Sequence, residues 1–173
     1  VWSQPDFFKH PVVYHTKQLM QKINNEEGIE MYIDFHGHSR LHGTFAYACP
    51  TFSFGSRSEK LFPLILSNIS NLFVWDNCVF SIPENRKDAS RCVINRELGI
   101  VNSYTIETSF GGMTSNSILY NEEMWKEIGK NVGEAIYRMY FEDNSKLLQQ
   151  FDSSNTVNEN LLNASDVINT QIY

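Results

Sequence analysis

The stretch MYIDFHGHSR, at Met31–Arg40, decides the fold. Its first half is mostly apolar, as in a strand that is covered on both faces, and its second half holds two histidines, a glycine and an arginine. Functional side chains in α/β proteins gather where a strand ends and a loop begins. Two imidazoles there indicate a metal site, although a zinc site needs three or four ligands and this stretch offers two or three at most. A hydrogen-bonded pair of surface histidines is the alternative.

Helices and strands alternate on both sides of this stretch. Apolar residues at helical spacing, together with turn residues at the ends, predict helices over 11–24, 58–72, 89–98 and 122–141. Apolar, β-branched and aromatic runs predict strands over 30–36, 44–49, 79–82 and 102–110. Such alternation predicts an α/β domain with a mixed, mostly parallel sheet sandwiched by helices.

The bulk properties narrow the class of protein. A chain of 173 residues is long enough for one domain with its own core. Its net charge of −6 argues against a nucleic-acid groove, and no apolar run reaches the length of a membrane span. Three cysteines without a CxxC pair predict reduced thiols in a cytosolic protein. With neither an initiator Met nor the apolar core of a signal peptide, the chain is expected to be a piece of a longer protein.

Two carboxylates stand out near the histidines. Asp34 lies two residues before His36, so both side chains leave the same face of a strand, and a carboxylate there can orient a ligating imidazole. A hydrogen bond to backbone at the strand end is the alternative for Asp34. Glu107 is the one charged residue in Tyr104–Phe110. Because a buried carboxylate is costly unless it is paired or used, Glu107 is a candidate general base; an exposed glutamate on an edge strand is the alternative.

Arginines supply the candidate anion-binding groups. Arg91 and Arg96 lie on the short helix that precedes the Glu107 strand. A guanidinium that faces a pocket binds a carboxylate in bidentate fashion, whereas a solvated helix face would give these residues no such role. The same two interpretations hold for Arg40. Tyr47 and Tyr104 are predicted to be core or rim aromatics.

Three blocks of the sequence resemble the cytosolic carboxypeptidase branch of the zinc metallocarboxypeptidases. They are DFHGHSR at Asp34–Arg40, RCVINRELGI at Arg91–Ile100 and SYTIETSFGG at Ser103–Gly112. The segment Trp2–Lys17 resembles the part of that family that follows its Asn-Arg-x-Trp motif. The likeness extends over residues 2–141. It implies a carboxypeptidase-like fold in which 1–141 is the C-terminal portion of a catalytic domain. The composition of 142–173, rich in Asn, Ser, Gln and Asp, predicts a polar, poorly ordered tail with a short helix near 156–163.

The resemblance assigns roles to residues that already stood out. In this family zinc is held by a His-x-x-Glu pair and a later histidine, which corresponds here to His36. The general base corresponds to Glu107, and Arg91 matches a basic residue that receives an acidic C-terminal side chain. His38 becomes a residue of the pocket wall. The implied substrates are protein or peptide C-termini that end in glutamate, such as glutamylated tubulin, in the cytoplasm, with neither nucleic acid nor membrane as a partner.

The sequence also departs from the family pattern. It contains no His-x-x-Glu pair and no Asn-Arg-x-Trp motif, and both are expected before Val1 in a longer chain. The 173 residues alone are therefore predicted to bind zinc weakly and to be inactive. Asp88–Ser90 replaces a run that is richer in Gly and Thr. A catalytically inactive module that binds peptides or acts as a scaffold is the alternative function.

Overall fold

The computed structural model describes residues 1–51, 58–113 and 118–153. Its helices and strands, in chain order, are α1 (Pro11–Glu26), β1 (Met31–His38), β2 (Thr44–Ala48), α2 (Ser58–Ile69), α3 (Ser90–Leu98), β3 (Asn102–Ser109), β4 (Gly112–Met113), β5 (Ile118–Leu119) and α4 (Glu122–Phe141). Two short 3-10 helices, η1 (Trp75–Asn77) and η2 (Glu84–Arg86), lie between α2 and α3. Among the described residues, no helix combines the length and the apolar character needed to cross a membrane.

The central sheet has the strand order β1-β3-β2. β1 runs parallel to β3, and this register sets Asp34 opposite Thr105 and His36 opposite Glu107. β2 runs antiparallel on the other side of β3, with Phe45 opposite Glu107. The sheet is therefore mixed, as predicted, and one of its two strand pairs is parallel. The central strand β3 carries Glu107 and lies next to β1, which carries His36. These two residues are 71 positions apart in the sequence.

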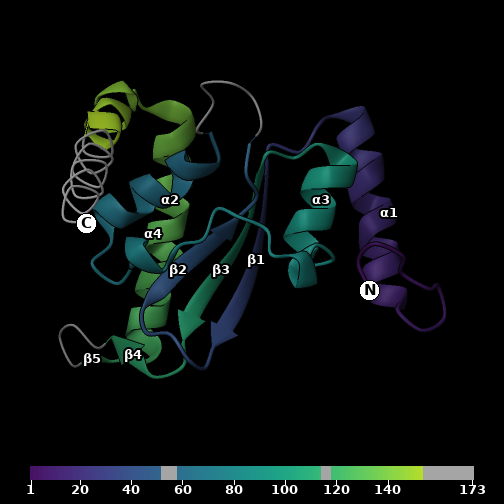
Figure 1. The fold of residues 1–173 in the computed structure, drawn as a ribbon, viewed down its shortest axis with the longest axis horizontal. Coiled ribbons are helices and arrows are strands. Elements are labelled where there is room, and N and C mark those ends of the chain that lie inside the picture. The colour runs from purple at the N-terminus through teal and green to yellow at the C-terminus, as the bar shows by residue number, and fades with distance from the viewer. Residues whose placement is uncertain (52–57, 114–117, 154–173) are drawn as a thin grey trace, which may run out of the picture.

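Helices cover both faces of this sheet (Figure 1). α2 and α4 lie together on one face, where they enclose the main core. α3 lies on the other face against β1 and β3, and α1 lies outside α3. The main core is built from Ala46, Ala48, Phe62, Ile65, Leu66, Phe73, Tyr104, Ile106, Val132 and Ala135. Each large aliphatic or aromatic side chain buried here stabilises the fold by about 1.5–3 kcal/mol.

The helix ends follow local rules that the sequence already carries. The Asn121 side chain accepts a hydrogen bond from the Met124 backbone N–H at 3.0 Å, which caps the N-terminus of α4. α3 ends at Gly99, which adopts a left-handed conformation with φ 72°. Pro63 lies inside α2 rather than in its first turn, because the helix begins at residue 58.

Apart from shifts of a few residues at element ends, the structure differs from the sequence-based expectation in the following places. The strand predicted at 79–82 is wrong, since only Val79 forms a bridge to Tyr47 before the chain turns away. β1 continues past His36, because Gly37 and His38 still pair with β3. In the described part of the tail, residues 145–153 are helical and Leu147 packs on the main core, where poor order was expected. The short helix expected near 156–163 lies outside the described residues.

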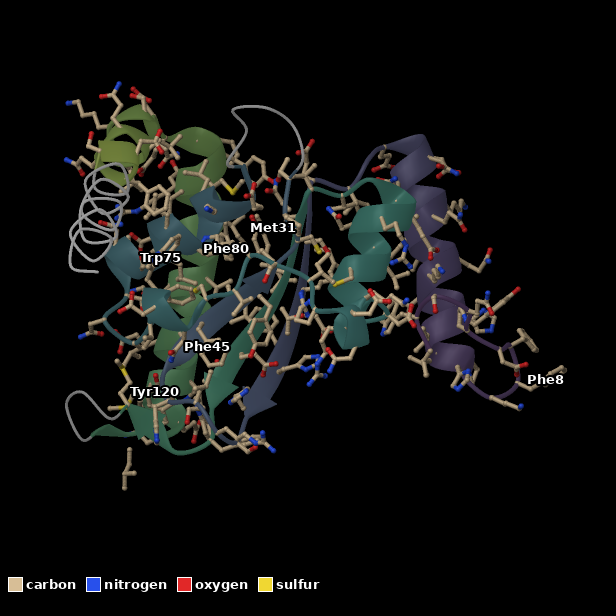
Figure 2. The ribbon with its side chains drawn as sticks, in the orientation of Figure 1. Phe8, Met31, Phe45, Trp75, Phe80 and Tyr120 are labelled. Atoms are coloured by element: carbon tan, nitrogen blue, oxygen red, sulfur yellow. The ribbon has the colours of Figure 1, made fainter. Side chains whose placement is uncertain are left out.

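The β1 side of the molecule is open. β1 is an edge of the sheet, and its Phe35 side chain is 60% exposed. α1 contains no buried residue. Phe8, before α1, extends away from the rest of the molecule, whereas Phe45, Trp75 and Phe80 lie within or against its body (Figure 2). The packing is therefore dense around β2 and β3 and sparse around β1 and α1.

Candidate active site

The alternation of β1 places Asp34 and His36 side by side on the face that carries α3. Nε2 of His36 lies 2.9 Å from Oδ2 of Asp34. The same carboxylate oxygen accepts a hydrogen bond from Oγ of Ser90, at the start of α3, at 2.6 Å. An imidazole whose Nε2–H is held by a carboxylate has its lone pair on Nδ1. Nδ1 of His36 is therefore the nitrogen that is left free, and it is the one that could bind a metal.

Glu107 faces this nitrogen from the neighbouring strand. Its Oε1 lies 4.0 Å from Nδ1 of His36, which is too long for a hydrogen bond. The residue is only 8% exposed, and no described residue donates a hydrogen bond to its carboxylate. A buried carboxylate in this state is costly to the fold, so its place beside a free imidazole nitrogen indicates a functional role. The two groups share one open space rather than bonding to each other.

Arg91 is a buried cation in the same region, 6% exposed. Its Nη1 donates a hydrogen bond to Oγ1 of Thr105 at 3.5 Å, and its guanidinium lies 5.2 Å from the centre of the Tyr47 ring. Its Nε is buried and has no hydrogen-bond partner among the described residues. Ser103 fixes the backbone beneath it, because the Ser103 hydroxyl donates to the Arg91 carbonyl at 2.8 Å. Arg91 also lines the cavity, so its guanidinium is a candidate for binding an anion there.

Burial and the carboxylate of Glu107 both raise the pKa of the Tyr47 phenol, and the nearby guanidiniums of Arg91 and Arg86 act in the opposite direction. Burial is the largest of these effects. The phenol therefore stays protonated and neutral at physiological pH, and it can donate a hydrogen bond to a ligand.

A single cavity of about 580 Å³ joins these groups. Its lining includes Trp2, Asp34, His36, His38, Tyr47, Arg86, Ser90, Arg91, Thr105 and Glu107. Carboxylates and imidazoles come from the strands, whereas both arginines come from the segment that precedes β3. The cavity thus holds acidic groups next to His36, and two arginines also line it.

The sequence is similar to those of known proteins. No protein-family model matches the chain. It is 33% identical over 147 residues to Cytosolic carboxypeptidase 2 of Mus musculus, a match that covers 80% of the chain and 17% of the relative. It is 36% identical over 107 residues to Cytosolic carboxypeptidase 2 of Danio rerio, covering 60% of the chain and 15% of the relative. The chain belongs to the cytosolic carboxypeptidase family. It spans only a small part of the length of the curated relatives that it matches.

Solved structures agree on the fold of this cytosolic carboxypeptidase segment. A metallo-carboxypeptidase from Burkholderia cenocepacia superposes with a TM-score of 0.66 at 20% identity, over 80% of this chain and 37% of that chain. A metallo-carboxypeptidase from Pseudomonas aeruginosa, in complex with (2-guanidinoethylmercapto)succinic acid, superposes with a TM-score of 0.65 at 20% identity. The second match covers 79% of this chain and 38% of that chain. The fold is therefore part of a carboxypeptidase-like α/β domain, as predicted from the sequence.

The other residues considered from the sequence either lie outside the cavity lining or hold the backbone in place. Arg96 points away from the cavity, since its Nη1 donates to the Lys87 carbonyl at 3.1 Å and its Nη2 lies 3.3 Å from Glu97. Arg40 does not line the cavity. His38 lines the cavity, and its Nδ1 accepts hydrogen bonds from the backbone N–H groups of Arg40 and Leu41, at 3.2 and 2.9 Å. His38 therefore fixes the turn after β1.

Sequence reasoning missed three cavity residues. Ser90 bonds to Asp34, Thr105 bonds to Arg91, and Arg86 lines the cavity from η2. The strand alternation of β3 carries a signal for Thr105, which lies two residues before Glu107. No local signal marks Ser90 or Arg86, because their roles depend on where α3 and η2 pack.

The donor set in this segment fits one part of a zinc site. Nδ1 of His36 is a free imidazole nitrogen, and a carboxylate holds the ring in place, as is usual for zinc-ligating histidines. No group of three His, Cys, Asp or Glu side chains that could hold a metal occurs in the described part of the chain. A complete site therefore needs ligands in addition to those described, since zinc sites in enzymes use three protein ligands.

Proposed function

We propose that the protein containing this chain is a zinc metallocarboxypeptidase that removes C-terminal glutamate from proteins or peptides. In this proposal His36 is one zinc ligand, Glu107 is the general base, and Arg91 binds the side chain of the released residue. The observation that carries it is the opposition of His36 and Glu107 across β1 and β3, with Nδ1 and Oε1 4.0 Å apart in one cavity. The family to which the chain belongs supports the same reaction class.

The residues divide the chemistry among them. Zinc, when bound, supplies a Lewis acid that makes a water molecule more acidic and polarises the peptide carbonyl. Nδ1 of His36 would hold the ion, and Asp34 keeps the imidazole in the orientation this requires. Glu107 takes a proton from the attacking water and passes it to the leaving amine. Its burial, with no donor from the described residues, leaves both oxygens free for this transfer.

Arg91 supports the preference for an acidic residue. Its guanidinium is anchored by Thr105 and the face of Tyr47, and no residue in the described part of the chain accepts a hydrogen bond from its Nε. A glutamate side chain in the cavity would accept a charge-assisted hydrogen bond from this guanidinium. The resemblance suggests glutamylated tubulin as a protein substrate, and the names of the relatives suggest a cytosolic location.

One observation favours a second function. The described residues contain no group of three side chains that could hold a metal, which would also suit an inactive carboxypeptidase-like module that binds peptides or serves as a scaffold. The two functions place different requirements on the rest of the protein's sequence. An enzyme needs a His-x-x-Glu pair elsewhere in the full sequence, and a module does not.

The test is Glu107→Gln in the full-length protein. We expect turnover of a peptide that ends in glutamate to fall by about 10²–10⁴-fold, while the zinc content of the purified protein stays unchanged. Glu97→Gln is the matched control, because Glu97 pairs with Lys17 outside the cavity, 2.6 Å from its Nζ. Turnover that survives in the Glu107 variant would contradict the proposed base. A wild-type protein without turnover would favour the module.

A further inference from the structure

His36 lies on the less supported side of the site. Among the described strands, β1 pairs with β3 on one side and with none on the other. The side chain of His36 is 50% exposed, whereas that of Glu107, on β3, is 11% exposed. A half-exposed imidazole on such a strand needs a fixed partner if it is to keep its place relative to buried groups. Asp34 is that partner, and Asp34 lies on β1 as well.

Ser90 gives Asp34 a contact with a different element of the fold. Its Oγ donates a hydrogen bond to Oδ2 of Asp34 at 2.6 Å, and the same oxygen lies 2.9 Å from Nε2 of His36. Because the acceptor is a carboxylate, the bond from Ser90 is charge-assisted and short. Ser90 is only 5% exposed, so water has little access to its hydroxyl. One oxygen of Asp34 is therefore shared between a helix and the imidazole.

The first turn of α3, which carries Ser90, is itself fixed to the inner part of the sheet. The carbonyl of Arg91, the next residue, accepts a hydrogen bond from the Ser103 hydroxyl on β3 at 2.8 Å. The same carbonyl accepts from the thiol of Cys49, directly after β2, at 3.6 Å. The start of α3 is thus tied to β3 and to the end of β2, and the Ser90 hydroxyl connects β1 to both.

The Ser90 hydroxyl is directed at β1 rather than used by its own helix. Serine at a helix start commonly accepts a hydrogen bond from a backbone N–H of the first turn, yet no side chain in the described part of the chain caps α3, whose N-cap is Ala89. Burial raises the pKa of the Tyr32 phenol, a hydrogen bond with the Ser90 side chain opposes this rise, and the Asp34 carboxylate adds to it. Two side chains on one face of β1, Tyr32 and Asp34, therefore meet the same hydroxyl.

We propose that Ser90 is a positioning residue that holds Asp34, and through it His36, at the place opposite Glu107 where the imidazole can bind zinc. This inference rests on the proposed function. In this role Ser90 supplies no ligand of its own and acts through the carboxylate alone. Without the hydroxyl, Asp34 is free to turn toward solvent, and the ring loses part of the support that orients a ligating histidine.

The first experiment measures the zinc affinity of the full-length protein by competition with a chelator of known affinity. We expect Ser90→Ala to weaken zinc binding by about two- to ten-fold, the range of one hydrogen bond. In an Asp34→Ala background the same substitution should cause little further loss, because Ser90 has no carboxylate left to hold. Ser90→Thr, which keeps the hydroxyl, should bind zinc more tightly than Ser90→Ala.

Ser70→Ala is the matched control. Ser70 is also 5% exposed, and its hydroxyl accepts a hydrogen bond from the Asn131 amide at 3.0 Å, on the face of the sheet that carries α2 and α4. This variant also loses one buried hydrogen bond, so its Tm should fall as that of Ser90→Ala does. Its zinc affinity should stay at the wild-type value, which separates positioning from a general loss of stability.

The second experiment needs no zinc. Diethyl pyrocarbonate reacts with free imidazole nitrogens, and tandem mass spectrometry measures the rate of modification at His36 in the metal-free full-length protein. We expect Ser90→Ala to raise this rate by about two- to ten-fold, because Nε2 is held less firmly by Asp34. Ser70→Ala should keep the wild-type rate.

Equal zinc affinities for the wild type and Ser90→Ala, or equal losses with and without Asp34, would overturn the role of Ser90. A wild-type protein that binds no zinc would contradict the proposed enzyme, and the modification rate then decides the inference. A faster rate at His36 in Ser90→Ala would support the positioning role, and an unchanged rate would overturn it.

Discussion

Nε2 of His36 lies 2.9 Å from Oδ2 of Asp34, and this contact decides which nitrogen of the ring faces Glu107. Ser90 holds the same oxygen from the first residue of α3 at 2.6 Å. A chain of contacts therefore runs from a helix N-terminus through a carboxylate to the imidazole. Its consequence is that Nδ1 is free and is aimed at the space in front of Glu107.

We expect Asp34→Asn to weaken zinc binding in the full-length protein by about 10–100-fold, the usual cost of losing a carboxylate that orients a ligating histidine. The neutral amide is a weaker acceptor, so the ring is held less firmly and its Nδ1 is less basic. Competition with a chelator of known affinity measures the effect. Asp76→Asn is a suitable control, because Asp76 lies in η1, away from the cavity lining. An unchanged zinc affinity would show that Asp34 has no orienting role.

The sequence predicted the parts of this site that follow from local rules. The spacing of Asp34 and His36 placed both on one strand face, and Glu107 stood out as a charge in a buried strand. The pairing of β1 with β3 needs contacts between distant segments, so the opposition of His36 and Glu107 could not be derived from spacing alone. The same holds for Ser90 and Arg86, whose roles appear only once α3 and η2 are packed.

The helices and strands show the same contrast between features set by local sequence and features that depend on distant contacts. Asn121 caps the start of α4 and Gly99 ends α3, both through local chemistry that the sequence carries. The strand expected at 79–82 had the right residue types, but only Val79 reaches the edge of β2. Strand propensity describes how well a residue fits a half-buried pleated surface. It does not say whether a neighbouring strand is available for more than one residue.

We expect Gly43→Ala to destabilise the protein more than Gly28→Ala. Both glycines have positive φ, 80° and 84°, so alanine is strained at either position. A Cβ at Gly28 would meet nothing within 4 Å among the described residues, whereas one at Gly43 would clash with Cγ2 of Val74. Strain alone costs about 1 kcal/mol, and overpacking adds about 1–3 kcal/mol. Urea unfolding measures both variants. Equal losses would mean that Val74 moves aside freely.

We expect the buried thiol of Cys78 to make the free energy of unfolding decrease at alkaline pH. Burial raises the pKa of its thiol from 9.0 to about 12, against a smaller lowering effect of the Ala46 N–H. Between these values the unfolded chain loses the proton and the folded protein keeps it. The free energy of unfolding therefore decreases as pH rises, by at most about 1.4 kcal/mol per pH unit. Cys78→Ser keeps an acceptor for Ala46 but does not titrate in this range, so its stability should fall less steeply between pH 9 and 11. Parallel urea-unfolding profiles for the two proteins would refute the assignment.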